Sequence, residues 1–212
     1  MGSLAENAAW PVPFFFGGRL CLDFVNTVNC RSKPATKDYI PDMAALLGWC
    51  SQLTVFDAET LTRLQTMAEK NAPVAKAAHA RATRFRETLF AIFQNTIIGE
   101  DPPKDALGAL GELVSAGRQR QCLKKVAERF VWSWEKSRLD LDAPLLAVAL
   151  SAEAMLIDGD LQRLKACPGP EGCGWLFYDE TKNASRRWCS MEHCGGAAKA
   201  RRHAARLREK RL

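Results

Sequence analysis

The chain has 212 residues, 47% of them hydrophobic, and a formal net charge of +6. This length and composition are those of an ordinary soluble protein, with room for one domain with a real core and a small appendage. No apolar run approaches the roughly 20 residues that span a bilayer, which argues against a membrane protein. We therefore expect a cytoplasmic protein with no membrane partner.

The N-terminal segment, up to about Gly18, contains prolines and the run Phe14–Phe16. We expect an arm without regular structure that packs its aromatic rings onto the body. The next segment is apolar enough to be buried, and if it is helical, Asp23 and Asn26 lie one turn apart. Because buried Asp and Asn side chains need hydrogen-bond partners, two interpretations stay open: a polar network that fixes the core, or a ligand-sensing pocket.

Apolar residues at helical spacing predict several helices along the body. The first is expected to begin at Pro41 and Asp42, the second at Asp57, and the third at Pro73. Gly99 should end the third helix, and a weaker fourth helix is expected over roughly 104–117. The arginines of the third helix are expected to form a solvated face: Arg81, Arg84 and Arg86.

Residues 128–134 alternate large apolar with small or polar side chains, which predicts a strand paired in a hairpin with 121–126. Asp142 is expected to cap a last body helix over 143–157, whose apolar character nearly all round makes it central. Gly159 should end that helix. We place the domain boundary near Asp160, with a helical domain over 1–160 and a smaller C-terminal unit over 161–212.

Four of the eight cysteines form two close pairs near the C-terminus, Cys167 with Cys173 and Cys189 with Cys194. Two short loops that each deliver a pair of thiolates meet the tetrahedral preference of Zn²⁺. The sequence therefore predicts one structural zinc ion held by these four residues. The alternatives are unrelated thiols, two disulfides, or His193 in place of Cys194. The remaining cysteines are scattered singly and are expected to be buried free thiols: Cys21, Cys30, Cys50 and Cys122.

The fifteen residues between Cys173 and Cys189 have the length of a two-stranded hairpin, with strands expected at 175–178 and 187–188. After Cys194 the chain is rich in Ala, Arg and Lys, which favour helix. The predicted fold is thus mainly α: a helical domain with a minor β-hairpin, then a treble-clef-like finger of loop, β-hairpin and basic helix.

The positive charge is concentrated in this tail. Residues 182–212 carry ten basic and two acidic side chains, a net +8, whereas residues 1–181 carry a net −2. A basic helix ordered by zinc can bind nucleic-acid phosphates through release of their counterions. The candidate contacts are Arg186, Arg187, Lys199, Arg201, Arg202 and Arg206. The alternative is a non-enzymatic protein-interaction or ligand-sensing module, in which the finger is a structural clasp and the tail is solvated or docks an acidic protein.

Catalysis is not expected. Four cysteines would close the coordination sphere of the metal, whereas a catalytic metal keeps an open position. Neither cysteine pair has the Cys-x-x-Cys spacing of thiol oxidoreductases.

The tail closely resembles the bacterial CGNR zinc-finger family. The motifs that carry this resemblance are Trp175–Asp179, Arg186–Met191, Cys194–Gly195 and Ala198–His203. The front of the chain, through Leu22–Thr27 and Leu141–Leu145, looks like the ABATE domain that precedes that finger. Together the two resemblances cover nearly the whole chain.

The resemblance implies a stress-associated bacterial transcription regulator whose finger binds DNA. The sequence departs from the name-giving motif, because Gly196 and Ala197 stand where the family has Asn and Arg. If that Arg touches DNA in relatives, this chain lacks one contact; if it is structural, Gly196 makes the helix start looser. A small-molecule effector, a protein partner and a homodimer all stay open.

Overall fold

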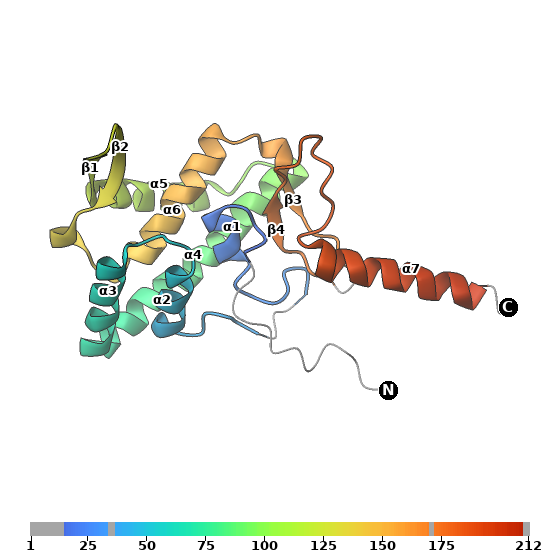
Figure 1. Cartoon of the computed structure of the whole chain (residues 1–212), viewed down its shortest axis with the longest axis horizontal. Coiled ribbons are helices and arrows are strands. Elements are labelled where there is room, and N and C mark those ends of the chain that lie inside the picture. Colours follow the sequence, from blue (N-terminus) through green and yellow to red (C-terminus); the bar gives the residue numbers. More distant parts are fainter. Residues whose placement is uncertain (1–14, 34–36, 170–171, 210–212) are drawn as a thin grey trace.

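The computed structural model describes residues 15–33, 37–169 and 172–209, and over these ranges the chain is mainly helical (Figure 1). Phe14, part of the predicted arm, lies outside the described residues. The helices are α1 (Leu20–Val25), α2 (Met43–Ser51), α3 (Ala58–Lys70), α4 (Ala72–Ile98), α5 (Lys104–Gln119), α6 (Ala143–Asp158) and α7 (Gly196–Glu209). Two antiparallel hairpins join β1 (Gln121–Val126) to β2 (Arg129–Trp134), and β3 (Leu164–Ala166) to β4 (Leu176–Tyr178). None of the helices in these ranges is both long and apolar enough to cross a membrane.

The predicted helix boundaries follow from capping. The side chains of Asp42, Asp57 and Asn71 accept hydrogen bonds from backbone amides in the first turns of α2, α3 and α4, at 2.8, 2.7 and 3.2 Å. Gly99, with φ +78°, ends α4 in the left-handed conformation. Asp142 precedes α6 as predicted, but its side chain makes no cap hydrogen bond and instead pairs with Arg81 at 2.8 Å.

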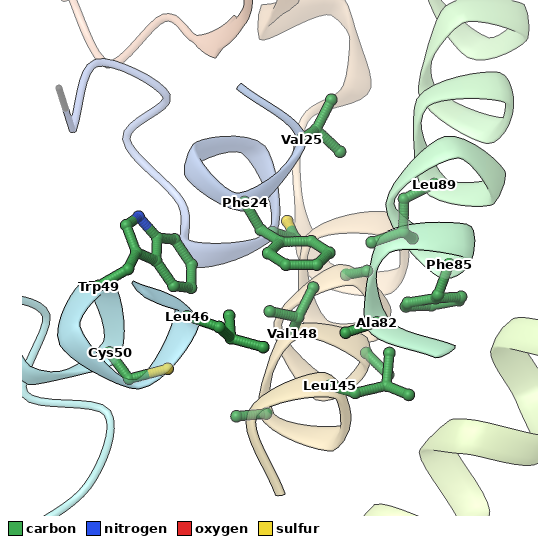
Figure 2. Packing of buried hydrophobic residues seen from close by; sticks show 14 of the residues in the cluster. Phe24, Val25, Leu46, Trp49, Cys50, Ala82, Phe85, Leu89, Leu145 and Val148 are labelled. Carbon is green, nitrogen blue, oxygen red and sulfur yellow. The ribbon is translucent and has the colours of Figure 1, made fainter. Parts of the chain in front are cut away.

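The core lies where α1, α2, α4 and α6 meet (Figure 2). Figure 2 shows Phe24 of α1 between Trp49 of α2 and the side chains of α4 and α6. Most of α6 is buried, including Leu145 and Val148, which confirms the prediction that this helix is central. Because α1 is buried in this core, the residues directly after it, including Asn26, are fixed in place.

The expectation of a solvated arginine face on α4 is wrong for one of its three members, Arg86, whereas Arg81 and Arg84 are exposed as predicted. The side chain of Arg86 is buried, and its guanidinium donates hydrogen bonds to Asp38 at 2.6 Å and to Thr27 at 3.0 Å. Arg81 remains exposed while it pairs with Asp142 at 2.8 Å. The segment that follows α1 passes beside α4 and supplies the carboxylate, an arrangement that helical spacing alone does not reveal.

The scattered cysteines are free, as predicted, although only two of them are buried. Burial raises the pKa of Cys21 and of Cys50 to about 12, so both thiols stay protonated and unreactive at neutral pH. Cys30 and Cys122 are half-buried.

Candidate metal centre and basic helix

The four predicted ligands come together at one point. The sulfur atoms of Cys167, Cys173, Cys189 and Cys194 all lie within 4.8 Å of one another. The Sγ of Cys189 is 3.7 Å from that of Cys173 and 3.6 Å from that of Cys194. A zinc–sulfur bond of about 2.3 Å gives a tetrahedron whose sulfur atoms are about 3.8 Å apart, so the donor set and spacing fit one structural zinc ion.

The alternatives to this ligand set are not seen. All four thiols are free, and their separations far exceed the roughly 2.05 Å of a disulfide bond. His193 is not a member of the cluster; its ring packs 5.6 Å from that of Phe16. Cys194, and not His193, is therefore the fourth member of the cluster.

The first cysteine pair lies at the tip of the β3–β4 hairpin. The amide of Cys167 donates to the carbonyl of Trp175 at 2.8 Å, which extends the strand pairing to the base of the loop. Gly174, with φ +64°, brings the chain back in a left-handed conformation that favours glycine. A Cβ on Gly169 would lie 2.5 Å from the Cβ of Cys173. Glycine at position 169 therefore allows the close approach to Cys173, and glycine at 174 allows the turn back into β4.

The second pair is delivered by a single π-helical turn, Met191–Gly195, that leads directly into α7. The hydroxyl of Ser190 accepts a hydrogen bond from the amide of His193 at 3.3 Å and so caps this turn. Cys194 lies within the turn, and Cys189 precedes it. A zinc ion held by these four cysteines would therefore tie the tip of the β3–β4 hairpin to the start of the basic helix.

The predicted hairpin within the finger is wrong in its pairing. Strand β4 pairs with β3, which precedes the first cysteine, and the described chain forms no strand at 187–188. Residues after β4 instead fold into an irregular loop around the buried side chain of Asp179. The finger thus keeps the cysteine loop and the helix of the expected arrangement, with a different hairpin.

Asp179 organises this loop and was missed by the sequence analysis. Its carboxylate accepts hydrogen bonds from Lys165 Nζ and the Arg186 amide, each at 2.7 Å, and from the Thr181 hydroxyl at 2.6 Å. Burial acts to raise the pKa of Asp179, but these donors, Lys165 foremost, hold it well below its usual range. The only local signal was the spacing Asp-x-Thr, which is typical of an Asx turn.

Arg186 also has an internal role. Its guanidinium donates to the carbonyls of Trp188 and Phe16, at 3.0 and 2.8 Å, and to that of Cys189, and it lies 4.6 Å from the centre of the Phe177 ring. These contacts hold the loop between β4 and Cys189, called the metal loop from here on, against the N-terminal arm. The predicted nucleic-acid contact at Arg186 is not supported by this placement.

Asn26 joins the helical body to the finger. Its side-chain amide donates to the carbonyl of Leu176 at 2.8 Å and accepts from the amide of the same residue at 2.9 Å. The indole of Trp175 donates to the carbonyl of Val28 at 2.6 Å. Asp23 is buried in the same region and accepts a hydrogen bond from the amide of Gly17 at 2.7 Å. Body and finger therefore share polar contacts at the start of β4.

Replacing Asp23 with Asn should flatten the pH dependence of stability. Burial raises the pKa of Asp23 from 3.8 to about 7, although the Gly17 amide and the Arg186 charge act to lower it. Between these two values the folded chain binds a proton that the unfolded chain does not, so stability falls as pH rises, by at most about 1.4 kcal/mol per pH unit. Urea unfolding should show that D23N gains stability over the wild type between pH 5 and pH 8. Equal pH dependence in the two proteins would contradict the prediction.

The basic helix α7 is buried near its start and exposed along the rest of its described side chains. Ala198 is buried, whereas every side chain from Lys199 to Arg208 is exposed. Figure 1 shows α7 projecting from the body, away from the end of the molecule that carries the β1–β2 hairpin. Four of the predicted contacts lie on this exposed length: Lys199, Arg201, Arg202 and Arg206. Arg187 is exposed as well, with its guanidinium 5.1 Å from the centre of the Trp188 ring.

Two family models match the chain, one over each of the two parts that carry the resemblances described above. The ABATE model, described as "putative stress-induced transcription regulator", matches residues 18–159, and the CGNR zinc-finger model matches residues 163–207. A comparison with curated proteins finds none that matches this chain.

Proposed function

Because the chain belongs to the ABATE family and carries a CGNR zinc finger, we propose that it is a transcription regulator that binds DNA through α7. The observation that carries this proposal is a basic helix with one end at the metal centre and the rest exposed. Such a protein would act in the cytoplasm on DNA, with no enzymatic step.

Physical considerations support a polyanionic partner for α7. The helix has 14 residues, and isolated helices of this length are marginal in water. Its side chains are exposed from Lys199 to Arg208, and over this length it carries five cations and no acidic residue. Phosphate groups would neutralise these cations and release counterions, which stabilises both the helix and the complex.

The proposed contacts divide into two groups. Lys199, Arg202 and Arg206 follow the helical repeat and share one face of α7, with Arg201 beside them. Arg187 adds a cation from the metal loop. These residues would position the protein on the phosphates, whereas sequence preference requires contacts to base edges. Gly196 and Ala197 offer no hydrogen-bonding side chain for such readout at the positions where the family motif has Asn and Arg.

Replacing Arg201, Arg202 and Arg206 together with Ala tests this proposal. The triple variant should lose affinity for random duplex DNA by about 100-fold or more at low salt, and its log–log salt slope should fall by about 2.7 if each Arg meets one phosphate. Fluorescence anisotropy at several salt concentrations measures both quantities.

The matched control removes three exposed cations from the helical body, in the variant R63A/K76A/R84A. It has the same net charge as the first variant, so a general charge effect would weaken both equally. Both proteins should retain one zinc ion. If the triple variant binds DNA as tightly as the control, α7 is not the binding surface, and the interpretation of the finger as a structural clasp gains support.

A further inference from the structure

The β1–β2 hairpin exposes an unusual amount of apolar surface. Five of its large apolar side chains are exposed: Leu123, Val126, Phe130, Val131 and Trp132. Exposed apolar patches on a soluble protein mark interaction surfaces. The hairpin lies at the opposite end of the molecule from α7 (Figure 1), so this surface is separate from the proposed DNA contacts.

Only the base of the hairpin is covered by the body. Cross-strand pairing places Leu123 opposite Trp132, on the same face as Phe130 and Trp134. Trp134 packs on Phe56, with ring centres 5.6 Å apart, whereas Phe130 is 70% exposed and Trp132 51%. A two-stranded hairpin is marginally stable by itself, so added strands would stabilise the uncovered part.

The two outer edges of the hairpin differ in charge. The exposed edge of β1 carries Lys124 and Lys125, a pattern that discourages pairing with another strand. Strand β2 has no charged residue from Phe130 to Trp134, and within the described ranges its outer edge pairs with no other strand. The free edge suited to pairing is therefore that of β2.

The pattern of hydrogen bonds between β1 and β2 shows which backbone N–H and C=O groups of β2 are left at its outer edge. The amide of Glu135 donates to the carbonyl of Arg120 at 2.8 Å, next to the last strand pair. In two antiparallel strands, residue pairs that are hydrogen-bonded alternate with pairs that are not. Because Arg120 and Glu135 form a hydrogen-bonded pair, the next pair, Gln121 with Trp134, is not hydrogen-bonded, and the alternation continues along the hairpin. The backbone groups of Phe130, Trp132 and Trp134 therefore point away from β1, toward any strand that adds to β2.

We propose that two copies of this chain dimerise through the β2 edge, in an antiparallel four-stranded sheet with a two-fold axis at Trp132. In this register Trp132 lies opposite Trp132 of the second copy, and Phe130 lies opposite Trp134, so the outward backbone groups meet. The same register places Arg129 opposite Glu135 of the second copy, twice by symmetry. A shift of two residues would place Arg129 opposite Ser133 and lose both ion pairs.

The charges at the two ends of this strand favour a second copy of the chain as the partner that pairs with the β2 edge. An isologous interface must be complementary to itself. Strand β2 together with the next residue, Glu135, meets that condition, with a base at one end and an acid at the other. Strand β1 carries Lys124 and Lys125 but no acidic residue of its own, and Lys125 already lies 3.9 Å from Glu128 in the turn that follows.

Charge reversal tests the dimer in the absence of DNA. The wild type should dimerise between about 1 and 100 µM in analytical ultracentrifugation. R129E would place acids opposite acids and E135R bases opposite bases, so each variant should weaken dimerisation by about tenfold or more. An equimolar mixture of the two variants should form mixed dimers, because the two chains are then complementary.

The control K125E makes the same charge change as R129E, but on the β1 edge, and should dimerise as the wild type does. Equal circular dichroism spectra would show that all variants are folded, and recovery in the mixture cannot come from misfolded chains. A wild type that stays monomeric overturns the proposal and leaves the edge to a different partner. Single variants that dimerise normally, or a mixture that stays monomeric, overturn it as well. None of these outcomes depends on DNA binding, so the proposed function stands or fails separately.

Discussion

Replacing Cys189 with Ser is expected to abolish zinc binding and to disorder the finger from the metal loop through α7. Cys189 is 2% exposed, and its sulfur lies within 3.7 Å of two other ligands. Structural zinc contributes about 10–16 kcal/mol in small fingers, far more than the packing of this segment can replace. Zinc content by mass spectrometry should fall from one ion per chain to none, with a loss of helical signal that matches α7.

The matched control for this change is Cys30→Ser. Cys30 is a half-buried thiol outside the cluster, and it donates to the carbonyl of Gly172 at 2.7 Å, a hydrogen bond that serine can also make. This variant should keep its zinc and its spectrum. A C189S protein with full zinc content and an unchanged spectrum would show that the four sulfur atoms are not the site.

Zinc loss should also weaken the helical body, because the finger and the body share polar contacts. Asn26 holds both backbone groups of Leu176, and Arg186 reaches the carbonyl of Phe16 in the N-terminal arm. The domain boundary proposed near Asp160 therefore separates two sequence motifs whose folded parts lie in direct contact.

Replacing Asp179 with Ala should destabilise the chain by about 3–5 kcal/mol, without removing a metal ligand. The loss leaves Lys165, Thr181 and the Arg186 amide without their buried acceptor, and an unpaired buried charge carries a cost of this size. Because Lys165 is 29% exposed and keeps two backbone acceptors, we expect the lower end of this range. Urea unfolding at pH 7 measures the change.

The pH dependence of this effect has a definite sign. The pKa of Asp179 is depressed in the folded state, so its stabilising contribution is present above about pH 4 and is lost as pH falls through the folded pKa. The difference between D179A and the wild type should therefore shrink in acid. Glu180→Ala is the control: that side chain is 63% exposed in its pair with Arg19, and its loss should change stability by less than about 1 kcal/mol. A D179A effect no larger than that of E180A would contradict the role given to Asp179.

The sequence by itself determined the features that depend on near neighbours. Asp42, Asp57 and Gly99 mark helix ends because caps act within one turn of the chain, and the apolar character of 143–157 identified the central helix α6. The four zinc ligands were found because cysteine pairs in short loops carry their chemistry in their spacing. Family motifs added the regulator class to this picture.

Only the tertiary structure decided which strand β4 pairs with and what the buried charges do. Strand β3 precedes the first cysteine and could not be identified as a partner from a segment of three residues. Arg86 and Arg186 were expected to face solvent or DNA, yet they bind Asp38 and the carbonyl of Phe16, which lie 48 and 170 residues away along the chain. Sequence spacing encodes local geometry, whereas the burial of a charge depends on acceptors that distant segments bring to it, and these meet only after the chain has folded.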